Sequence, residues 1–158
     1  MNDHGAGETS DSSGLVVFFR PVSDAVPVPS YASTGAAGAD IHAWIPHPIQ
    51  VEPGERVLIP SGLHVQIPQG YELQVRSRSG LAIKQGIFVI NSPGTIDCDY
   101  RGEIKVILGN IGTDTVTIMP GERIAQLVLA PVIRAEFRLA DELQATERGQ
   151  GGFGSTGR

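Results

Sequence analysis

The chain has 158 residues, of which 41% are hydrophobic and 18% charged, and its formal net charge is -5. This length fits one compact domain with short tails. The acidic balance disfavours extended binding to a phosphate backbone, so no nucleic-acid partner is expected. A single cysteine, Cys98, excludes a disulfide within the chain. There is no apolar run long enough to span a bilayer and no recognisable secretory signal, so we expect a cytoplasmic protein without membrane contact.

The elements predicted along the chain are short. Residues 1–14 are small and polar, which predicts a disordered tail. Apolar runs then alternate with turns rich in Gly and Pro, and strands are predicted at 15–19, 39–44, 57–59, 63–67, 71–75, 87–90, 116–118, 124–129 and, weakly, 135–139. One helical turn is predicted at 79–84, a hairpin at 95–108 with its turn at 99–102, and a further turn at 120–122. Such closely spaced strands are typical of an all-β, jelly-roll-like sandwich or distorted barrel.

The first candidate site is the tripeptide Arg78-Ser79-Gly80. Arginine offers a planar fork of donors that suits phosphate, serine adds a hydroxyl, and glycine lets backbone N–H groups approach an anion. Taken alone, the tripeptide is better explained as a surface turn with an exposed arginine.

The second candidate is the segment 91–100, in which Asp97 and Asp99 flank Cys98. One carboxylate could activate a water molecule while the other organises the turn. Aspartate is also simply a good turn residue, so the pair alone is weak evidence. Cys98 is better explained as a small buried residue than as a nucleophile, because no histidine lies in a suggestive position.

Three further features are weak individually. Gln126 lies in an apolar strand, where alternation predicts that it shares a face with Ile124 and Val128 and needs a partner if buried. The tail 148–157 is rich in glycine, but it has neither the strand nor the lysine of a P-loop. It could close over a ligand or remain disordered. Asp40 follows the small residues 36–39 and could meet a metal or an arginine.

Together and in this order, these segments resemble the five motifs of the homotrimeric dUTPase family. The corresponding residues are 36–43, 78–82, 91–106, 121–131 and 148–157, and the resemblance covers about residues 15–158. One departure is Ser77, where many members have proline, and we expect only a small local effect on the loop. The resemblance implies a jelly-roll-like β-barrel over residues 15–146, assembled as a homotrimer. It also implies a flexible arm at 147–158 that closes a site shared by three subunits.

The resemblance implies the activity as well: hydrolysis of dUTP to dUMP and pyrophosphate, which keeps uracil out of DNA and supplies dUMP for thymidylate synthesis. Asp97 would activate the water that attacks the α-phosphorus in line. Mg²⁺ would be held by the substrate phosphates and reach Asp40 through water. The substrate-binding residues implied by the family are Arg78, Ser79, Gly80, Asn91, Gly94, Thr95, Ile96, Tyr100, Lys105, Gln126, Arg148, Phe153, Gly154, Ser155 and Thr156.

Base and sugar selection would fall to the segment 91–105. Asn91 and the backbone around Thr95, Ile96 and Lys105 would read the uracil edge, leaving no room for a 5-methyl group. Tyr100 would exclude a 2′-hydroxyl, and Phe153 would stack on the base.

Two alternatives stay open at this point: a dCTP deaminase of related fold, and a non-catalytic nucleotide-binding regulatory protein. The deaminase needs a general base near C4, for which Glu103 is the one glutamate in the hairpin.

Overall fold

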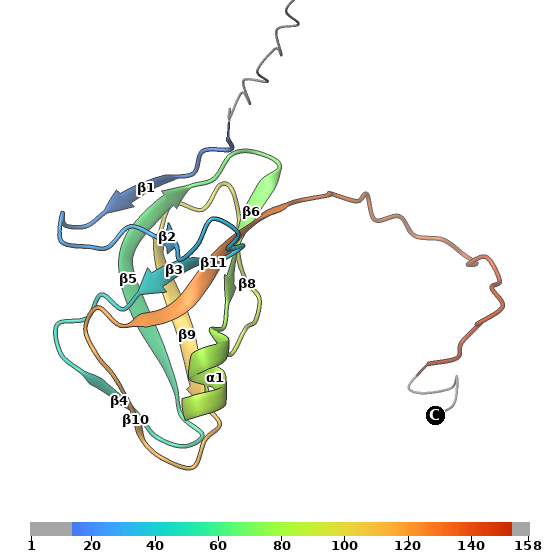
Figure 1. Cartoon of the computed structure of the whole chain (residues 1–158). Coiled ribbons are helices and arrows are strands. Elements are labelled where there is room, and N and C mark those ends of the chain that lie inside the picture. Colours follow the sequence, from blue (N-terminus) through green and yellow to red (C-terminus); the bar gives the residue numbers. More distant parts are fainter. Residues whose placement is uncertain (1–13, 153–158) are drawn as a thin grey trace, which may run out of the picture.

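The structure, a computed structural model, describes residues 14–152, and its regular secondary structure consists of antiparallel strands and one short helix. One sheet has the order β1(Phe18–Pro21), β5(Arg56–Gln66), β9(Glu103–Asn110), β7(Ile87–Val89). A second has the order β2(Ser30–Tyr31), β3(Ala39–His42), β11(Arg123–Pro131), β6(Tyr71–Arg76), β8(Gly94–Ile96). A short ribbon pairs β10(Val116–Ile118) with β4(Ile49–Val51), and the helix α1(Ser79–Gln85) follows β6 (Figure 1).

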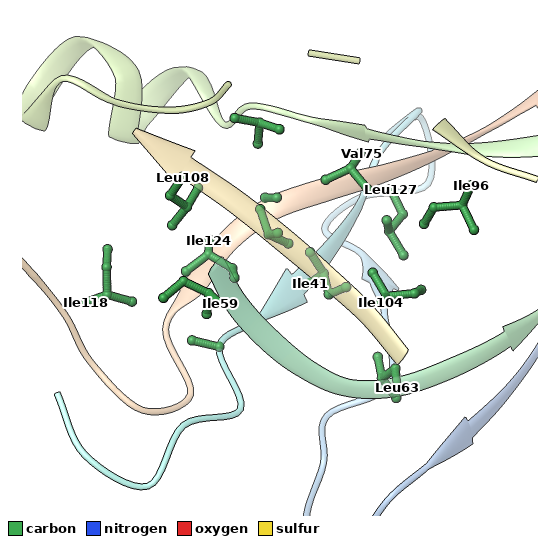
Figure 2. Packing of buried hydrophobic residues seen from close by; sticks show 14 of the residues in the cluster. Ile41, Ile59, Leu63, Val75, Ile96, Ile104, Leu108, Ile118, Ile124 and Leu127 are labelled. Carbon is green, nitrogen blue, oxygen red and sulfur yellow. The ribbon is translucent and has the colours of Figure 1, made fainter. Parts of the chain in front are cut away.

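The hydrophobic core lies between the sheets and is built mainly from isoleucine, leucine and valine. Ile41 of β3, Ile59 of β5, Leu108 of β9 and Ile124 of β11 are all at most 1% exposed and converge in the interior (Figure 2). Burying a side chain of this size contributes roughly 1.5–3 kcal/mol. This two-sheet arrangement confirms the predicted all-β, jelly-roll-like fold.

The strand β5 corrects one expectation. Strands at 57–59 and 63–67 were predicted to be separated by Pro60-Ser61-Gly62, but β5 runs unbroken through them. A bulge makes this possible, because the register against β9 shifts between Pro60 and His64. Gly62, with φ of +69°, takes a conformation that suits glycine. The prediction failed because Pro and Gly mark bulges as well as turns.

The expected hairpin at 95–108 is also wrong. The strands β8 and β9 both exist, but β8 pairs with β6 in one sheet and β9 pairs with β5 and β7 in the other. The connection therefore crosses from one sheet to the other. A sequence shows that two strands are close in the chain, but the burial of each strand decides which sheet it joins.

The helix α1 confirms the helical turn predicted at 79–84. It ends at Gln85, and the next residue, Gly86, adopts the left-handed conformation with φ of +69° and donates its N–H to Ala82 O. This is the usual role of glycine after the last helical residue. The helix begins directly at the Arg78-Ser79-Gly80 segment, so it fixes where that segment lies.

After β11 the chain leaves the barrel and extends away from it (Figure 1). The hydrogen bond from Val132 N to Gly70 O, at 2.8 Å, ties the start of this segment to the barrel. The weak strand predicted at 135–139 does not form, and Phe137 is 96% exposed. Across the described residues, no helix has the length and apolarity required to cross a membrane.

Candidate active site

A cleft of about 430 Å³ opens where β3, β6 and β11 meet the start of α1. It brings together five of the residues singled out from the sequence: Asp40, Arg78, Ser79, Gly80 and Gln126. The remaining lining residues are Ala32, Ala36, Ala37, Gly38, Arg76, Arg123 and Val128. Three arginines and a run of small residues thus surround one hollow, an arrangement suited to a polyanion.

Asp40 organises this cleft through two ion pairs. Its Oδ1 lies 3.0 Å from Arg78 Nε, and its Oδ2 lies 3.0 Å from Arg123 Nη1. Arg78 Nη1 also donates to Arg123 O at 3.0 Å. The Asp40 side chain is only 15% exposed, so it is partly shielded from solvent. Each carboxylate oxygen therefore holds a different guanidinium at the cleft.

Sequence reasoning did not select Arg123 or Arg76. Arg123 lies opposite His42 in the register of β3 and β11, two positions along β3 from Asp40. Arg76 lies opposite Gln126, and its Nε and Nη2 both donate to Gln74 Oε1. The signal for Arg123 was available, because it falls inside the motif at 121–131. The register that brings it to Asp40 depends on a bulge and was not predictable from that motif.

His42 lies beside this cluster with a buried ring nitrogen. Its Nδ1 has no hydrogen-bond partner among the described residues. Burial of the ring lowers the pKa of His42 below the ordinary 6.5, because it disfavours the charged form. Asp40 acts in the opposite direction, whereas Arg123 and Arg78 add to the lowering of the pKa. A neutral imidazole therefore borders the arginine cluster at neutral pH.

Gln126 does have the partner that its position requires. Its Nε2 donates to Ser77 O at 2.9 Å, while Ser77 Oγ accepts from Val89 N at 2.8 Å. A Cβ at Gly38 would force the end of the Gln126 side chain to move, so a small residue there favours this arrangement. The expectation that Gln126 shares a face with Ile124 is wrong. A register shift between Arg123 and Ala125 inserts Ile124 as an extra, buried residue and offsets the alternation.

A second, smaller pocket of about 180 Å³ lies between the diverging β8 and β9. It is lined by Thr95, Ile96, Tyr100, Glu103, Ile104 and Lys105. Tyr100 donates its hydroxyl to Glu103 O at 2.9 Å, so its ring is held at the pocket rather than free in solvent. Asn91 lies in the turn before β8 and Gly94 is the first residue of that strand, where a Cβ would be 3.1 Å from Asn91 Nδ2.

The remaining predicted residues lie apart from the cleft. Asp97 is exposed and follows directly on β8, and it is absent from the cleft lining that the described residues form. Arg148 lies in the extended C-terminal segment and donates from Nε to Gly151 O at 2.8 Å. Phe153, Gly154, Ser155 and Thr156 are outside the described residues. Among the described residues, the predicted residues that line a pocket therefore fall into two separate pockets of one chain.

Within residues 14–152, no group of three or more His, Cys, Asp or Glu side chains is arranged to hold a metal ion. Asp40 uses one lone pair on each oxygen for an arginine. A carboxylate has about four lone-pair sites, so Asp40 can still accept hydrogen bonds from water. These residues fit a metal that is brought by a ligand and touches the protein through water.

The fold and the arginine-lined cleft define an all-β protein equipped to bind a phosphorylated ligand. A family model described as dUTPase matches residues 24–157. The chain is 59% identical over 131 residues to the deoxyuridine 5′-triphosphate nucleotidohydrolase of Bdellovibrio bacteriovorus, covering 83% of this chain and 88% of that one. With the enzyme of the same name from Roseobacter denitrificans it shares 57% identity over 133 residues, or 84% and 88% of the two chains.

Solved structures agree with these relatives. A mutant dUTPase of Staphylococcus bacteriophage 80alpha, determined with dUpNHpp, superposes with a TM-score of 0.79 at 26% identity, covering 90% of this chain and 99% of that one. A second mutant of the same phage enzyme gives a TM-score of 0.77 at 27% identity, with 89% and 98% coverage. The chain belongs to the dUTPase family, which confirms the resemblance noted in the sequence.

Proposed function

We propose that this chain hydrolyses dUTP to dUMP and pyrophosphate. The observation that carries the proposal is the cleft in which Asp40 holds Arg78 and Arg123 side by side. Two guanidinium groups fixed in advance can neutralise a triphosphate without losing much side-chain freedom on binding. Membership of the dUTPase family supplies the substrate class. Such an activity removes dUTP from the pool available for DNA and provides dUMP for thymidylate synthesis.

The active site is shared by three subunits. Asp97 and the pocket between β8 and β9 belong to one subunit, and the arginine cleft to its neighbour, with the arm at 147–158 contributed by the third. This assembly is supported by the separation of the two pockets on one chain. It is also supported by the exposure of Ile133 and Phe137, each 96% exposed in the isolated chain. Large apolar side chains along an extended segment are typical of a surface that packs on another subunit.

The chemistry requires positioning and charge neutralisation more than covalent catalysis. Asp97 accepts a proton from a water molecule. The oxygen of that water then attacks the α-phosphorus from the side opposite the departing pyrophosphate. Arg78, Ser79, Gly80 and Gln126 bind the phosphate oxygens in the cleft, and Arg148, Ser155 and Thr156 add donors from the arm. Mg²⁺ bound to the triphosphate would neutralise part of its charge. Asp40 would meet this ion through water while it keeps the two arginines in place.

The pocket between β8 and β9 selects the base and the sugar. Asn91 and backbone groups near Gly94, Thr95, Ile96 and Lys105 pair with the uracil edge. A base with the wrong donors leaves buried polar groups unpaired, which costs about 1–3 kcal/mol per group. Tyr100, held by Glu103 O, packs on the deoxyribose and excludes a 2′-hydroxyl. Phe153 and Gly154 of the arm cover the base. A cytoplasmic location stays a prediction from the sequence.

The deaminase alternative is disfavoured by the contacts of Glu103. Its Oε1 accepts from Gly62 N at 2.8 Å, and its Oε2 lies 3.8 Å from Lys105 Nζ. A carboxylate that is engaged in this way is poorly placed to act as a general base on a pyrimidine. The non-catalytic alternative is distinguished from the hydrolase only by measuring turnover.

The test is pyrophosphate release with Mg²⁺ from dUTP, dTTP, dCTP and UTP at equal concentration. We expect release from dUTP at least 100-fold faster than from the other three, because the pocket rejects a methyl group, an amino group and a 2′-hydroxyl. Ammonia from dCTP without pyrophosphate would instead identify a deaminase. Binding of dUpNHpp with no product from any nucleotide would favour a regulatory binding protein.

A further inference from the structure

The turn that carries Asp97 has little backbone support. It crosses from β8 to β9, which lie in different sheets, so neither strand extends a ladder to it. Tyr100 N donates to Asp97 O at 3.1 Å. Arg101 Nη1 donates to Cys98 O and Tyr100 O, both at 2.8 Å. These contacts fix the internal shape of the turn, and the Tyr100 hydroxyl, which donates to Glu103 O at 2.9 Å, ties its end to the start of β9.

His64 of β5 provides an attachment to the barrel. Its Nδ1 lies 2.9 Å from Arg101 O, the carbonyl at the far end of the turn. A carbonyl oxygen can only accept, so Nδ1 carries the hydrogen and donates it. Arg101 is thereby connected at both ends: its guanidinium organises the turn, and its carbonyl is held by the sheet.

The bulge of β5 is what brings His64 to this position. Pro60 pairs with Lys105 and His64 with Glu103, so residues 61–63 of β5 face a single residue, Ile104, on β9. Side chains replace the ladder bonds that are lost there. Ser61 Oγ donates to Ile104 O at 2.6 Å, and Gly62 N donates to Glu103 Oε1 at 2.8 Å. Bulges near active sites commonly re-aim a side chain in this way.

We propose that His64 is a positioning residue for catalysis: by holding Arg101 O, it sets the position of the turn that presents Asp97. This inference rests on the proposed dUTP hydrolysis. His64 itself touches neither the arginine cleft nor the pocket between β8 and β9. His64 acts on the turn through the single hydrogen bond from Nδ1 to Arg101 O. A substitution that keeps a donor at the position of Nδ1 should therefore preserve the position of the turn.

The test compares His64→Ala with His64→Asn. Asparagine carries a donor nitrogen on Cγ, as histidine carries Nδ1, and can therefore still reach Arg101 O. We expect kcat for dUTP to fall on the order of 10-fold or more in His64→Ala, because a small displacement of a catalytic group is costly. The affinity for dUpNHpp should fall less than kcat, because the arginine cleft is untouched although Tyr100 of the same turn also shifts. His64→Asn should recover most of both losses. His47, exposed in the loop between β3 and β4, provides the control His47→Ala, with unchanged kcat.

Hydrogen exchange supplies a readout that does not depend on turnover. The backbone amides of residues 97–102 should exchange faster in His64→Ala than in the wild type or in His64→Asn. Unchanged exchange and unchanged kcat in His64→Ala would overturn the inference. Equal losses in His64→Ala and His64→Asn would also overturn it, because the hydrogen bond would then not be the cause. An inactive wild type with the expected exchange pattern would reject the proposed function but not the role of His64 in holding the turn.

Discussion

Asp97 and Asp99 lie two residues apart in the same exposed turn, which makes them a natural pair for testing the general base. We predict that Asp97→Asn lowers kcat for dUTP by about 10²–10⁴-fold, the usual contribution of a positioned base. The affinity for dUpNHpp should change little, because asparagine has nearly the same shape and the arginines remain in place. Pyrophosphate release and calorimetric titration measure the two quantities.

Asp99→Asn is the matched control, since it removes the same charge from the same turn. It should retain kcat within a few fold. Near-normal turnover in Asp97→Asn, or an equal loss in both variants, would remove Asp97 from the role of base. The comparison separates proton transfer from a general effect of negative charge near the triphosphate.

At the scale of single residues, the sequence predicted the composition of the cleft better than its internal contacts. Arg78 and Gln126 were selected from motifs, and the structure does bring both to the cleft beside Asp40. Motif spacing could not show that Asp40 also binds Arg123, because that contact depends on the pairing of β3 with β11. It also could not show that Ser77 O accepts from Gln126. To predict contacts between residues that are distant in the chain, one must know the pairing register of their strands. That register depends on β-bulges, which the motifs do not reveal.

At the scale of elements, the sequence predicted structure correctly where neighbouring residues alone determine the backbone conformation. The helical turn predicted at 79–84 forms as α1 and stops before Gly86, because glycine tolerates the left-handed conformation. The same reasoning failed for the segment 95–108. There the pairing of β8 with β6 is decided by burial of Gly94 and Ile96 in the second sheet, not by the intervening turn. Tertiary packing overrides the local preference for a hairpin.

Gly86 also offers a test of how α1 is attached to the barrel. A Cβ at this position would lie 2.5 Å from Gly112 N and 2.8 Å from Gly112 Cα, and the backbone would be strained as well. We predict that Gly86→Ala lowers the free energy of unfolding by about 2 kcal/mol or more. Urea unfolding at a fixed protein concentration measures this change. The control is Gly35→Ala, where nothing lies within 4 Å of the added carbon, so its stability should change far less.

At the scale of the whole molecule, the distribution of charge favours binding of a small anion in one cleft over binding of an extended polyanion along the surface. The net charge of -5 would repel an extended nucleic acid, yet Arg76, Arg78 and Arg123 gather at one cleft. A small anion can use that cleft without meeting the acidic surface elsewhere. The barrel therefore provides a rigid support for the proposed phosphate binding, while residues 132–150 are exposed in the single chain.

That segment is the basis of the last prediction. We expect a chain ending at Glu147 to keep its fold and its assembly but to lose at least about 100-fold in kcat/KM for dUTP. Among the described residues, the hydrophobic core contains none of 148–152, whereas the site would lose Arg148 and the residues proposed to close over the substrate and exclude water. Circular dichroism and light scattering check the fold and the assembly, and pyrophosphate release checks the activity.

A chain lacking only Arg158 is the control, because it keeps the whole segment 148–157. Full activity in the shorter chain would show that the arm has no part in catalysis, and the shared site would then consist of two subunits rather than three.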